Sequence, residues 1–223
     1  MTSLPSGADI HPIRVCTSAN VKGVKQDHKK AFYWYSISAE QGNANAQNNL
    51  GLMYDSGKGV AKDHEKAVQW FLKSGEQGYA DAQYNIGMMY GNGDGVTEDK
   101  QRAAHWFTKS AEQGDASAQC RLGSMYDDGE GVTEDDEKAV YWYSKSAEQG
   151  DASAQFRLGL MYNIGEGVTQ DNVHAHKWWN IALANGVEKA GKIRDSVEQQ
   201  MSQEQIAEAQ KLAREWTEAH NNN

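Results

Sequence analysis

One block of sequence recurs along this chain every 36 residues. The frame G-x-M-Y occurs in strict register, beginning at Gly51, Gly87, Gly123 and Gly159. A second frame, A-x-x-W, keeps the same spacing and begins at Ala31, Ala67, Ala103, Ala139 and Ala175. A fixed period between about 20 and 50 residues is typical of solenoids, in which each unit packs only on its neighbours. The period therefore predicts one continuous array of repeats and argues against a chain of unrelated domains.

Each block reads as two helices separated by a glycine-containing loop. In residues 43–78, Ala46, Leu50 and Met53 recur at helical spacing and predict the apolar face of a first helix, called helix A. Glycines then mark the helix end, and Asp63 is placed to cap a second helix, called helix B. The cap recurs at Asp27, Asp99, Asp135 and Asp171. The predicted fold class is all-α, an α-solenoid of helix pairs.

Glycine inside a helix costs about 1 kcal/mol relative to alanine, yet each predicted helix A contains one at the same register, such as Gly51. We interpret this glycine as a point where a neighbouring helix lies against the backbone with no Cβ between them. The tryptophan and tyrosine of each block are expected to supply most of the buried area between repeats. The tryptophans spaced 36 residues apart are accordingly predicted to be core residues rather than a ligand-binding set.

The charge balance and the cysteines exclude some classes of protein. The chain has 31 acidic and 22 basic side chains, and its formal net charge of -9 would repel a phosphate backbone. No nucleic-acid partner is therefore expected. The two cysteines, Cys16 and Cys120, share no repeat register, so a disulfide framework is not indicated.

The N-terminal sequence bears on the location of the protein. Residues 1–20 lack the basic and long apolar segments of a secretory signal. No stretch approaches the ~20 consecutive apolar residues of a membrane span, so membrane insertion is not expected. As written, the sequence predicts a cytoplasmic protein, and a periplasmic or secreted location is the alternative if the N-terminus is truncated.

The two ends of the array depart from the repeat. Residues 21–42 match only a loop and helix B, a half repeat, and residues 1–20 are a degenerate segment in which Pro12 interrupts the expected helix A. This segment is either a degenerate cap or the remainder of a missing upstream portion. A monomer is expected, with a dimer through the open N-terminal edge as the alternative. Capping helices are predicted over residues 187–220. The full repeats between the ends are residues 43–78, 79–114, 115–150 and 151–186.

Residues 115–150 carry the repeat most fully, as DASAQCRLGSMYDDGEGVTEDDEKAVYWYSKSAEQG. The pattern A-x-A-Q-x-x-L-G-x-M-Y-x-x-G-x-G-V, followed by D-x-x-K-A-x-x-W-x-x-K-S-A-E-Q-G, resembles the Sel-one-like repeat family, a relative of the tetratricopeptide repeat. The resemblance covers about residues 21–187. It implies a right-handed superhelix of antiparallel helix pairs. It also implies adaptor or scaffold work in signalling, secretion and host contact, mostly without catalysis.

An enzymatic role, of the β-lactamase or another hydrolase kind, is one alternative. A cysteine-rich branch of the family is linked to penicillin binding and staples each helix pair with a disulfide, which this chain does not do. Such chemistry would use a Ser-x-x-Lys nucleophile frame, and no serine here has a lysine three residues later. No nucleophile–base pair, phosphate loop or metal frame is present either. The sequence therefore predicts a protein that is not an enzyme and has no cofactor.

Positions on helix A that vary between repeats, opposite the packing stripes, are candidates for binding a protein or peptide. In related superhelices helix A lines the concave side, so these positions are expected to form the floor of a groove. The aromatic residues Tyr84 and Phe156 and two arginines are of the types that carry interface energy, and the arginines would offer carboxylate or C-terminal capture. The alternative is that these side chains are partly buried filler. The predicted binding band consists of Asn48, Asn49, Leu52, Tyr84, Asn85, Met88, Cys120, Arg121, Ser124, Phe156, Arg157 and Leu160.

Other groups of residues favour structural roles. The acidic residues at 127–128 and 134–137 lack the spacing of a calcium loop and predict a solvated loop. His174 and His176 face different sides of a helix, unlike helical zinc ligands, so no metal site is expected. Cys120 is better explained as a small apolar filler than as a reactive thiol. A structural spacer within a larger assembly is the remaining alternative to an adaptor.

Overall fold

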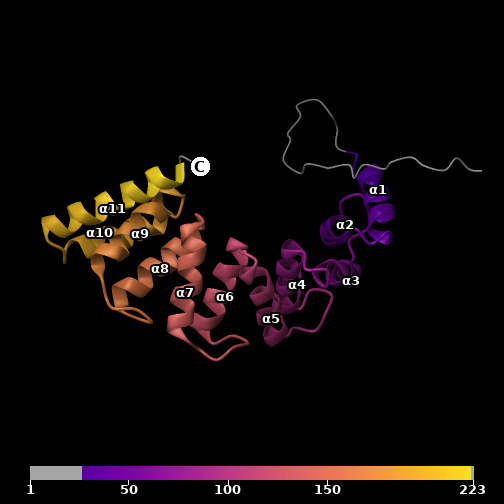
Figure 1. Ribbon diagram of the computed structural model, residues 1–223, viewed down its shortest axis with the longest axis horizontal. Coiled ribbons are helices and arrows are strands. Elements are labelled where there is room, and N and C mark those ends of the chain that lie inside the picture. Colours follow the sequence, from indigo (N-terminus) through magenta and orange to yellow (C-terminus); the bar gives the residue numbers. More distant parts are fainter. Residues whose placement is uncertain (1–26, 222–223) are drawn as a thin grey trace, which may run out of the picture.

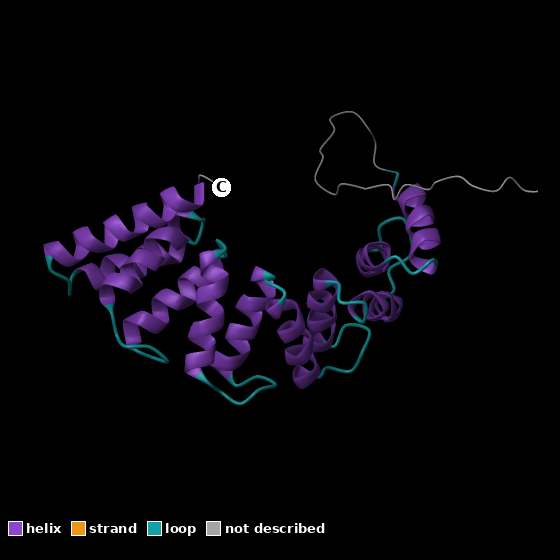
Figure 2. Cartoon of the chain, in the orientation of Figure 1, coloured by secondary structure: helices purple, strands orange, loops and turns teal. Residues whose placement is uncertain are grey.

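Eleven α-helices joined by loops make up residues 27–221, the residues that this computed structural model describes (Figure 2). The helices follow one another in an arc, with α1 and α11 at its two ends (Figure 1). The expectations for residues 1–20 and for the first residues of the half repeat lie outside the described range. The helices are α1 (His28–Glu40), α2 (Ala44–Ser56), α3 (His64–Gly75), α4 (Ala80–Asn92), α5 (Lys100–Glu112), α6 (Ala116–Asp128), α7 (Asp136–Glu148), α8 (Ala152–Ile164), α9 (Asn172–Ala184), α10 (Glu188–Glu198) and α11 (Gln203–Asn221).

The helices alternate between the two predicted types. Helix A of the four full repeats corresponds to α2, α4, α6 and α8, and copies of helix B are α1, α3, α5, α7 and α9. Each helix A packs on the helix B that follows it and also on the helix B that precedes it. The predicted all-α solenoid of 36-residue repeats is therefore confirmed, because each helix pair packs on its neighbours in the chain.

An aromatic ring of helix B lies directly on the glycine of helix A in each full repeat. A Cβ built on Gly87 of α4 would lie only 2.7 Å from Cδ1 of Phe107 in α5. The predicted close approach of a neighbouring helix to the glycine backbone is therefore present, and it is made by an aromatic side chain of helix B in the same repeat. The equivalent pairs are Gly51 with Phe71, Gly123 with Tyr143 and Gly159 with Trp179.

The prediction that the regularly spaced tryptophans are core residues is wrong for most of them. Trp34 is 59% exposed, and Trp70, Trp106 and Trp142 are only partly buried. Trp178 alone of the five is buried. In the full repeats the core aromatic is the residue that follows each tryptophan, because that position faces the glycine of helix A. Trp106 lies about 100° round the helix from Phe107, and its ring lies 3.4 Å from the place of a Cβ on Gly75 in the preceding helix B.

A buried glutamine joins three helices at each repeat boundary. Gln83 of α4 donates from Nε2 to the backbone oxygen of Gly75 in α3 at 3.0 Å, and its Oε1 accepts from Nε2 of Gln113 at the end of α5 at 2.6 Å. Ser110 of α5 donates to the backbone oxygen of Ala80 at 2.9 Å. Because a buried polar group without a partner costs roughly 1–3 kcal/mol, these bonds fix the register between repeats. The equivalent glutamines are Gln47, Gln119 and Gln155.

Each interhelical loop closes over the repeat that precedes it. Gly95 has a φ of +70°, and a Cβ at this residue would collide with the backbone of His64 at the start of α3. A side chain would therefore strain the loop and also push it away from the preceding repeat. Gly59, Gly131 and Gly167 occupy the same place in the other loops.

Aspartate caps begin the copies of helix B, as predicted. Three of these carboxylates, those of Asp27, Asp63 and Asp135, also pair with the lysine three residues later. Oδ2 of Asp63 lies 2.9 Å from Nζ of Lys66, and Oδ2 of Asp135 lies 2.7 Å from Nζ of Lys138. The hydrogen bonds from these lysines lower the pKa of both aspartates below its ordinary value.

Two glycines of α4 allow the effect of ring packing on stability to be measured separately from the effect of helix propensity. Gly87→Ala would press a methyl group against the Phe107 ring, and we expect it to destabilise the protein by about 1–3 kcal/mol, the usual cost of overpacking. A Cβ on Gly91 meets only Cβ of Ala103 at 3.7 Å, so Gly91→Ala should stabilise the protein by up to about 1 kcal/mol. Urea denaturation followed by circular dichroism measures both effects. Equal effects of the two substitutions would contradict the ring-on-glycine interpretation.

Because of the capping carboxylates, the stability of the folded protein should fall at acid pH. Because the pKa of these carboxyl groups is lower in the folded state, the unfolded chain binds more protons at acid pH. The stability that the carboxylates contribute is therefore fully present above the unfolded pKa, near 3.8. It is lost as the pH falls through the folded pKa. We expect the melting temperature to drop between about pH 5 and about pH 2. The double variant Asp63→Asn with Asp135→Asn keeps neutral caps and should drop less in thermal melts. Glu166→Gln, in an exposed loop, is the control, and an unchanged profile in the double variant would refute the expectation.

Candidate functional site

A hollow of about 400 Å³ lies on one face of α4, α6 and α8 and reaches the start of α10. Because the repeats stack in register, matching positions of three successive copies of helix A meet there. The hollow is also lined by Ser117, Tyr143, Asp151, Ser153, Val187 and Lys189. Half of the predicted binding band lines it, namely Tyr84, Cys120, Arg121, Ser124, Phe156 and Arg157.

The lining of the hollow gathers positive charge in an acidic chain. Arg121, Arg157 and Lys189 contribute three cationic groups, against the single carboxylate of Asp151. That carboxylate already caps α8, where it accepts a hydrogen bond from the backbone N–H of Ala154 at 2.8 Å. Both arginines are exposed. The hollow therefore presents cationic groups to solvent, which suits an anionic ligand.

A partly buried carboxylate holds one of the arginines in place. Nη1 of Arg157 lies 3.7 Å from Oδ2 of Asp127, and the hydroxyl of Tyr143 donates to the same oxygen at 3.1 Å. Burial raises the pKa of Asp127, while the hydrogen bond from Tyr143 opposes that rise. Tyr143 is also the ring that packs on Gly123. The position of Arg157 is thereby tied to the core of the preceding repeat.

Two aromatic rings form the apolar part of the hollow. Phe156 is 6% exposed and is a wall rather than a protruding anchor. Nζ of Lys189 lies over this ring, 4.1 Å from its centroid. Tyr84 is partly buried and packs against Phe107, with the ring centroids 5.6 Å apart. Aromatic surface and cationic groups are thus adjacent in the same hollow.

The other half of the band lies outside the hollow. Asn48 is buried, and its Oδ1 accepts a hydrogen bond from Nδ2 of Asn85 at 3.0 Å. Asn49 bonds within its own helix, whereas Leu52 is 40% exposed. The structure therefore uses Asn48 to join two repeats and does not leave it open to a partner. The last two residues of the band pack against apolar clusters, Met88 and Leu160.

Five polar residues of the hollow are missing from the predicted band, namely Ser117, Tyr143, Asp151, Ser153 and Lys189. Tyr143 belongs to helix B and Asp151 precedes helix A, so a search restricted to variable positions on helix A does not find them. Lys189 lies in α10, where the sequence departs from the repeat. The only signal for Lys189 is its place directly after the last repeat, because the next helix in a solenoid packs beside the last one.

The two histidines of α9 bind different partners, as their spacing predicts. Nδ1 of His174 lies 2.7 Å from Oδ2 of Asp171, whereas Nε2 of the buried His176 lies 2.6 Å from Oε1 of Glu198. Across residues 27–221, no three His, Cys, Asp or Glu side chains gather as a possible metal site. No helix in the described part of the chain combines the length and apolar character of a membrane span.

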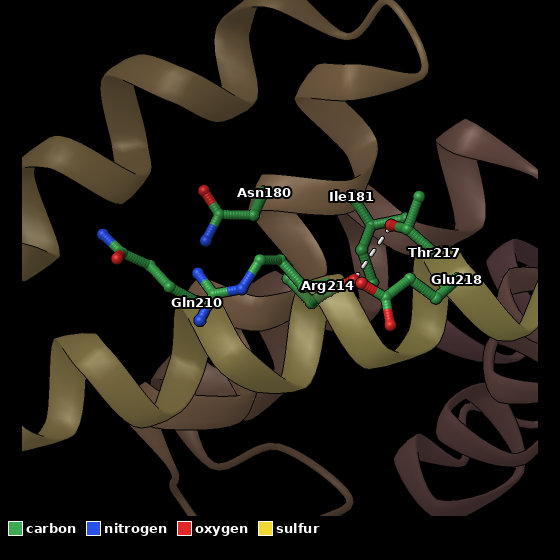
Figure 3. A pocket seen from close by; sticks show the side chains of 7 residues that line it. Asn180, Ile181, Gln210, Arg214, Thr217 and Glu218 are labelled. Carbon is green, nitrogen blue, oxygen red and sulfur yellow. Dashed lines mark hydrogen bonds between the residues drawn. The ribbon is translucent and has the colours of Figure 1, made fainter.

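A second hollow, of about 410 Å³, lies where α11 crosses α9 (Figure 3). Asn180 and Ile181 of α9 line it together with residues of α11 that include Gln210 and Arg214. The amide of Asn180 is already engaged, because its Oδ1 accepts from Nη1 of Arg194 at 2.7 Å. This hollow therefore marks the edge of the contact between α9 and α11.

The model of one known repeat family matches five segments of the chain. The chain belongs to the Sel1 repeat family. Sel1 repeats generally serve as protein-interaction scaffolds and are typically non-catalytic. The four full segments start one residue later than the repeats predicted from the sequence. The matched segments are residues 21–43, 44–79, 80–115, 116–151 and 152–187.

Solved structures of other Sel1 repeat proteins share this fold. A Sel1 repeat protein from Oxalobacter formigenes is 38% identical with a TM-score of 0.72, over 77% of this chain and 50% of that one. The protective antigen c5321 of uropathogenic Escherichia coli, described as displaying an SLR fold, is 34% identical with a TM-score of 0.55, over 88% of this chain and 50% of that one. This chain therefore matches half the length of each. No curated protein matches the chain.

Cys120 should react slowly although it lines the hollow. Burial, together with the nearby Asp151, raises the pKa of its thiol to about 12, and the thiolate is the reactive form. In a Cys16→Ser variant, we expect Ellman's reagent at about pH 8 to label the folded protein at least about tenfold more slowly than the urea-unfolded protein. Equal rates would show that the thiol is accessible and ionised, contrary to the filler role.

Proposed function

We propose that the chain is a non-catalytic scaffold that binds an acidic peptide segment of a partner protein in the hollow of α4, α6 and α8. One observation carries this proposal. Three cationic side chains, of Arg121, Arg157 and Lys189, meet the rings of Tyr84 and Phe156 at a single place in a chain whose net charge is -9. Asp151 is the one carboxylate among the lining residues, so the lining carries a net positive charge even though Asp127 lies beside Arg157, and this favours an anionic ligand at this place.

The chemistry of the hollow favours a carboxylate. A guanidinium presents parallel N–H donors that match the two oxygens of a carboxylate. Arg121 of α6 and Arg157 of α8 occupy the same register, one repeat apart. We infer that they contact two acidic groups of one ligand, either two side chains or a side chain and a C-terminal carboxylate. Tyr84 and Phe156 add apolar surface of the type that carries binding energy.

The shape of the site favours an extended ligand. The binding band crosses successive repeats, and a volume of about 400 Å³ is in the range of pockets that enclose small ligands or a few side chains. An extended peptide can place alternate side chains in such a site while its backbone continues along the band. We therefore infer a short linear segment rather than a folded domain.

A peptide selection tests the proposal. A display library of random short peptides is selected on the wild type, and enriched peptides are measured by fluorescence anisotropy. We expect sequences rich in Asp and Glu, with binding that weakens as salt is added. Their affinity should fall at least about tenfold in the double variant Arg121→Glu with Arg157→Glu, equivalent to the loss of about 1.4 kcal/mol. The matched control is Lys58→Glu with Lys62→Glu, which changes the charge equally at exposed loop positions.

The outcomes separate three possibilities once thermal melts show that all variants are folded. Loss of binding in the arginine variant alone supports the hollow as the site. Equal binding by both variants places the site elsewhere and contradicts the proposal. In a pull-down with the same variants, a structural spacer would retain every partner, whereas an adaptor that uses the hollow would lose its client.

A further inference from the structure

The C-terminal helix α11 packs on α9, the last copy of helix B. The rings of Trp216 in α11 and Trp178 in α9 meet edge to face, with their centroids 6.0 Å apart. Nε1 of Trp216 donates to Oε2 of Glu148, the last residue of α7, at 2.7 Å. Trp178 is only 3% exposed, whereas the equivalent tryptophans of other repeats are partly exposed. A docked helix thus uses two groups of the repeat, a tryptophan face and the glutamate that ends the preceding helix B.

The same two groups recur one, two and three repeats earlier. The glutamates are exposed, and the tryptophans are partly buried. Among residues 27–221, α11 makes its main helix contact with α9. Each pair therefore has the groups that hold Trp216 but lacks a helix in the described part of the chain. The pairs are Glu40 with Trp70, Glu76 with Trp106 and Glu112 with Trp142.

The position of a lysine distinguishes two of these pairs from the occupied one, where Lys177, directly before Trp178, lies over the ring at 4.2 Å from its centroid. Nζ of Lys73 lies 4.0 Å from the ring centroid of Trp70, and Nζ of Lys109 lies 4.7 Å from that of Trp106. At the equivalent position α9 has Ile181, which shares an apolar cluster with Ala213 of α11. A ligand helix at the lysine-bearing pairs therefore needs an acidic side chain where α11 has Ala213, one turn before its tryptophan. In the third repeat the equivalent lysine, Lys145, lies over Tyr141 rather than over Trp142. The pair of Glu112 with Trp142 is therefore not part of the proposed surface.

We propose that the helix-B surface at Trp70 and Trp106 is a second interaction surface, which binds an amphipathic partner helix. The partner helix carries a tryptophan and, three residues before it, an acidic side chain. The tryptophan covers Trp70 or Trp106 and donates its indole N–H to Glu40 or Glu76, and the acidic side chain pairs with Lys73 or Lys109. The contact of α11 with Glu148 and Trp178 is the template within the same chain. This surface is built from helix B and does not depend on the hollow formed by helix A.

A peptide made from α11 tests the proposal on the full chain. The probe is residues 202–221 with Ala213→Glu, and isothermal titration measures its binding. We expect two equivalent sites, with at least about tenfold weaker binding for the unmodified α11 sequence and for the probe that also carries Trp216→Ala. In the protein, Glu40→Lys with Glu76→Lys removes both acceptors at helix C-termini, where lysine is compatible with the helix dipole. This variant should weaken binding at least about tenfold.

A matched variant with Glu134→Lys and Glu166→Lys changes the charge equally at exposed residues near the opposite ends of the helices, and it should bind as the wild type does. Thermal melts establish that both variants are folded. Wild-type affinity in the Glu40→Lys with Glu76→Lys variant would overturn the proposal, because the peptide would then be replacing α11 at Glu148 or binding elsewhere. Absence of saturable binding up to about 1 mM, the weak end of the usual affinity scale, would also overturn it.

Discussion

The hydrogen bonds of one buried glutamine per repeat set how this array stacks. Gln83 donates to a carbonyl oxygen at the end of the preceding helix B, one of the groups that a helix leaves without an internal partner. Its own carbonyl accepts from Gln113 at the end of the following helix B. The amide of Gln83 therefore donates a hydrogen bond to the end of the preceding helix B and accepts one from the end of the following helix B. The ring that packs on Gly87 and the loop that closes over the preceding repeat both require the register that this amide defines.

Because every repeat boundary has the same register, variable side chains from different repeats come together on one surface. Arg121 and Arg157 come from different repeats, yet they line one hollow because their helices are offset by one unchanging step. Positions that the boundary does not use are free to differ, and the hollow collects such differences from three repeats. Asn48 shows the limit of this freedom, since its bond to Asn85 uses a variable position for stacking. Helix A thus carries both the residues that stack the repeats and the candidate binding residues, and most of its residues serve only one of these two roles.

The period, the caps and the helical glycines were predictable because each leaves a local mark in the sequence. Aspartate before a helix and glycine within one both carry a cost or a bond that can be read without a structure. The burial of the aromatics was not predictable in this way. Trp106 and Phe107 are adjacent and both aromatic, and only the place of helix A, whose Gly87 lies against the Phe107 ring, decides which of them enters the core. The position of α11 was equally hidden, because Trp216 and Glu148 belong to no common period. In the hollow, the shared strip of arginines followed from register, whereas Lys189 lay beyond the last repeat.

Identical boundaries also affect how such a chain can change during evolution. Excision or duplication of 36 residues in register joins two surfaces that already fit, so unequal recombination within the gene can alter the number of repeats without new compensating substitutions. Insertion or deletion of a single residue inside a helix would instead turn every later side chain of that helix by about 100°. In α4, such a change before Gln83 would separate this residue from its partners. The hollow needs three consecutive copies of helix A, whereas stacking needs only neighbours. A lineage that loses repeats would therefore give up recognition before it gives up the fold.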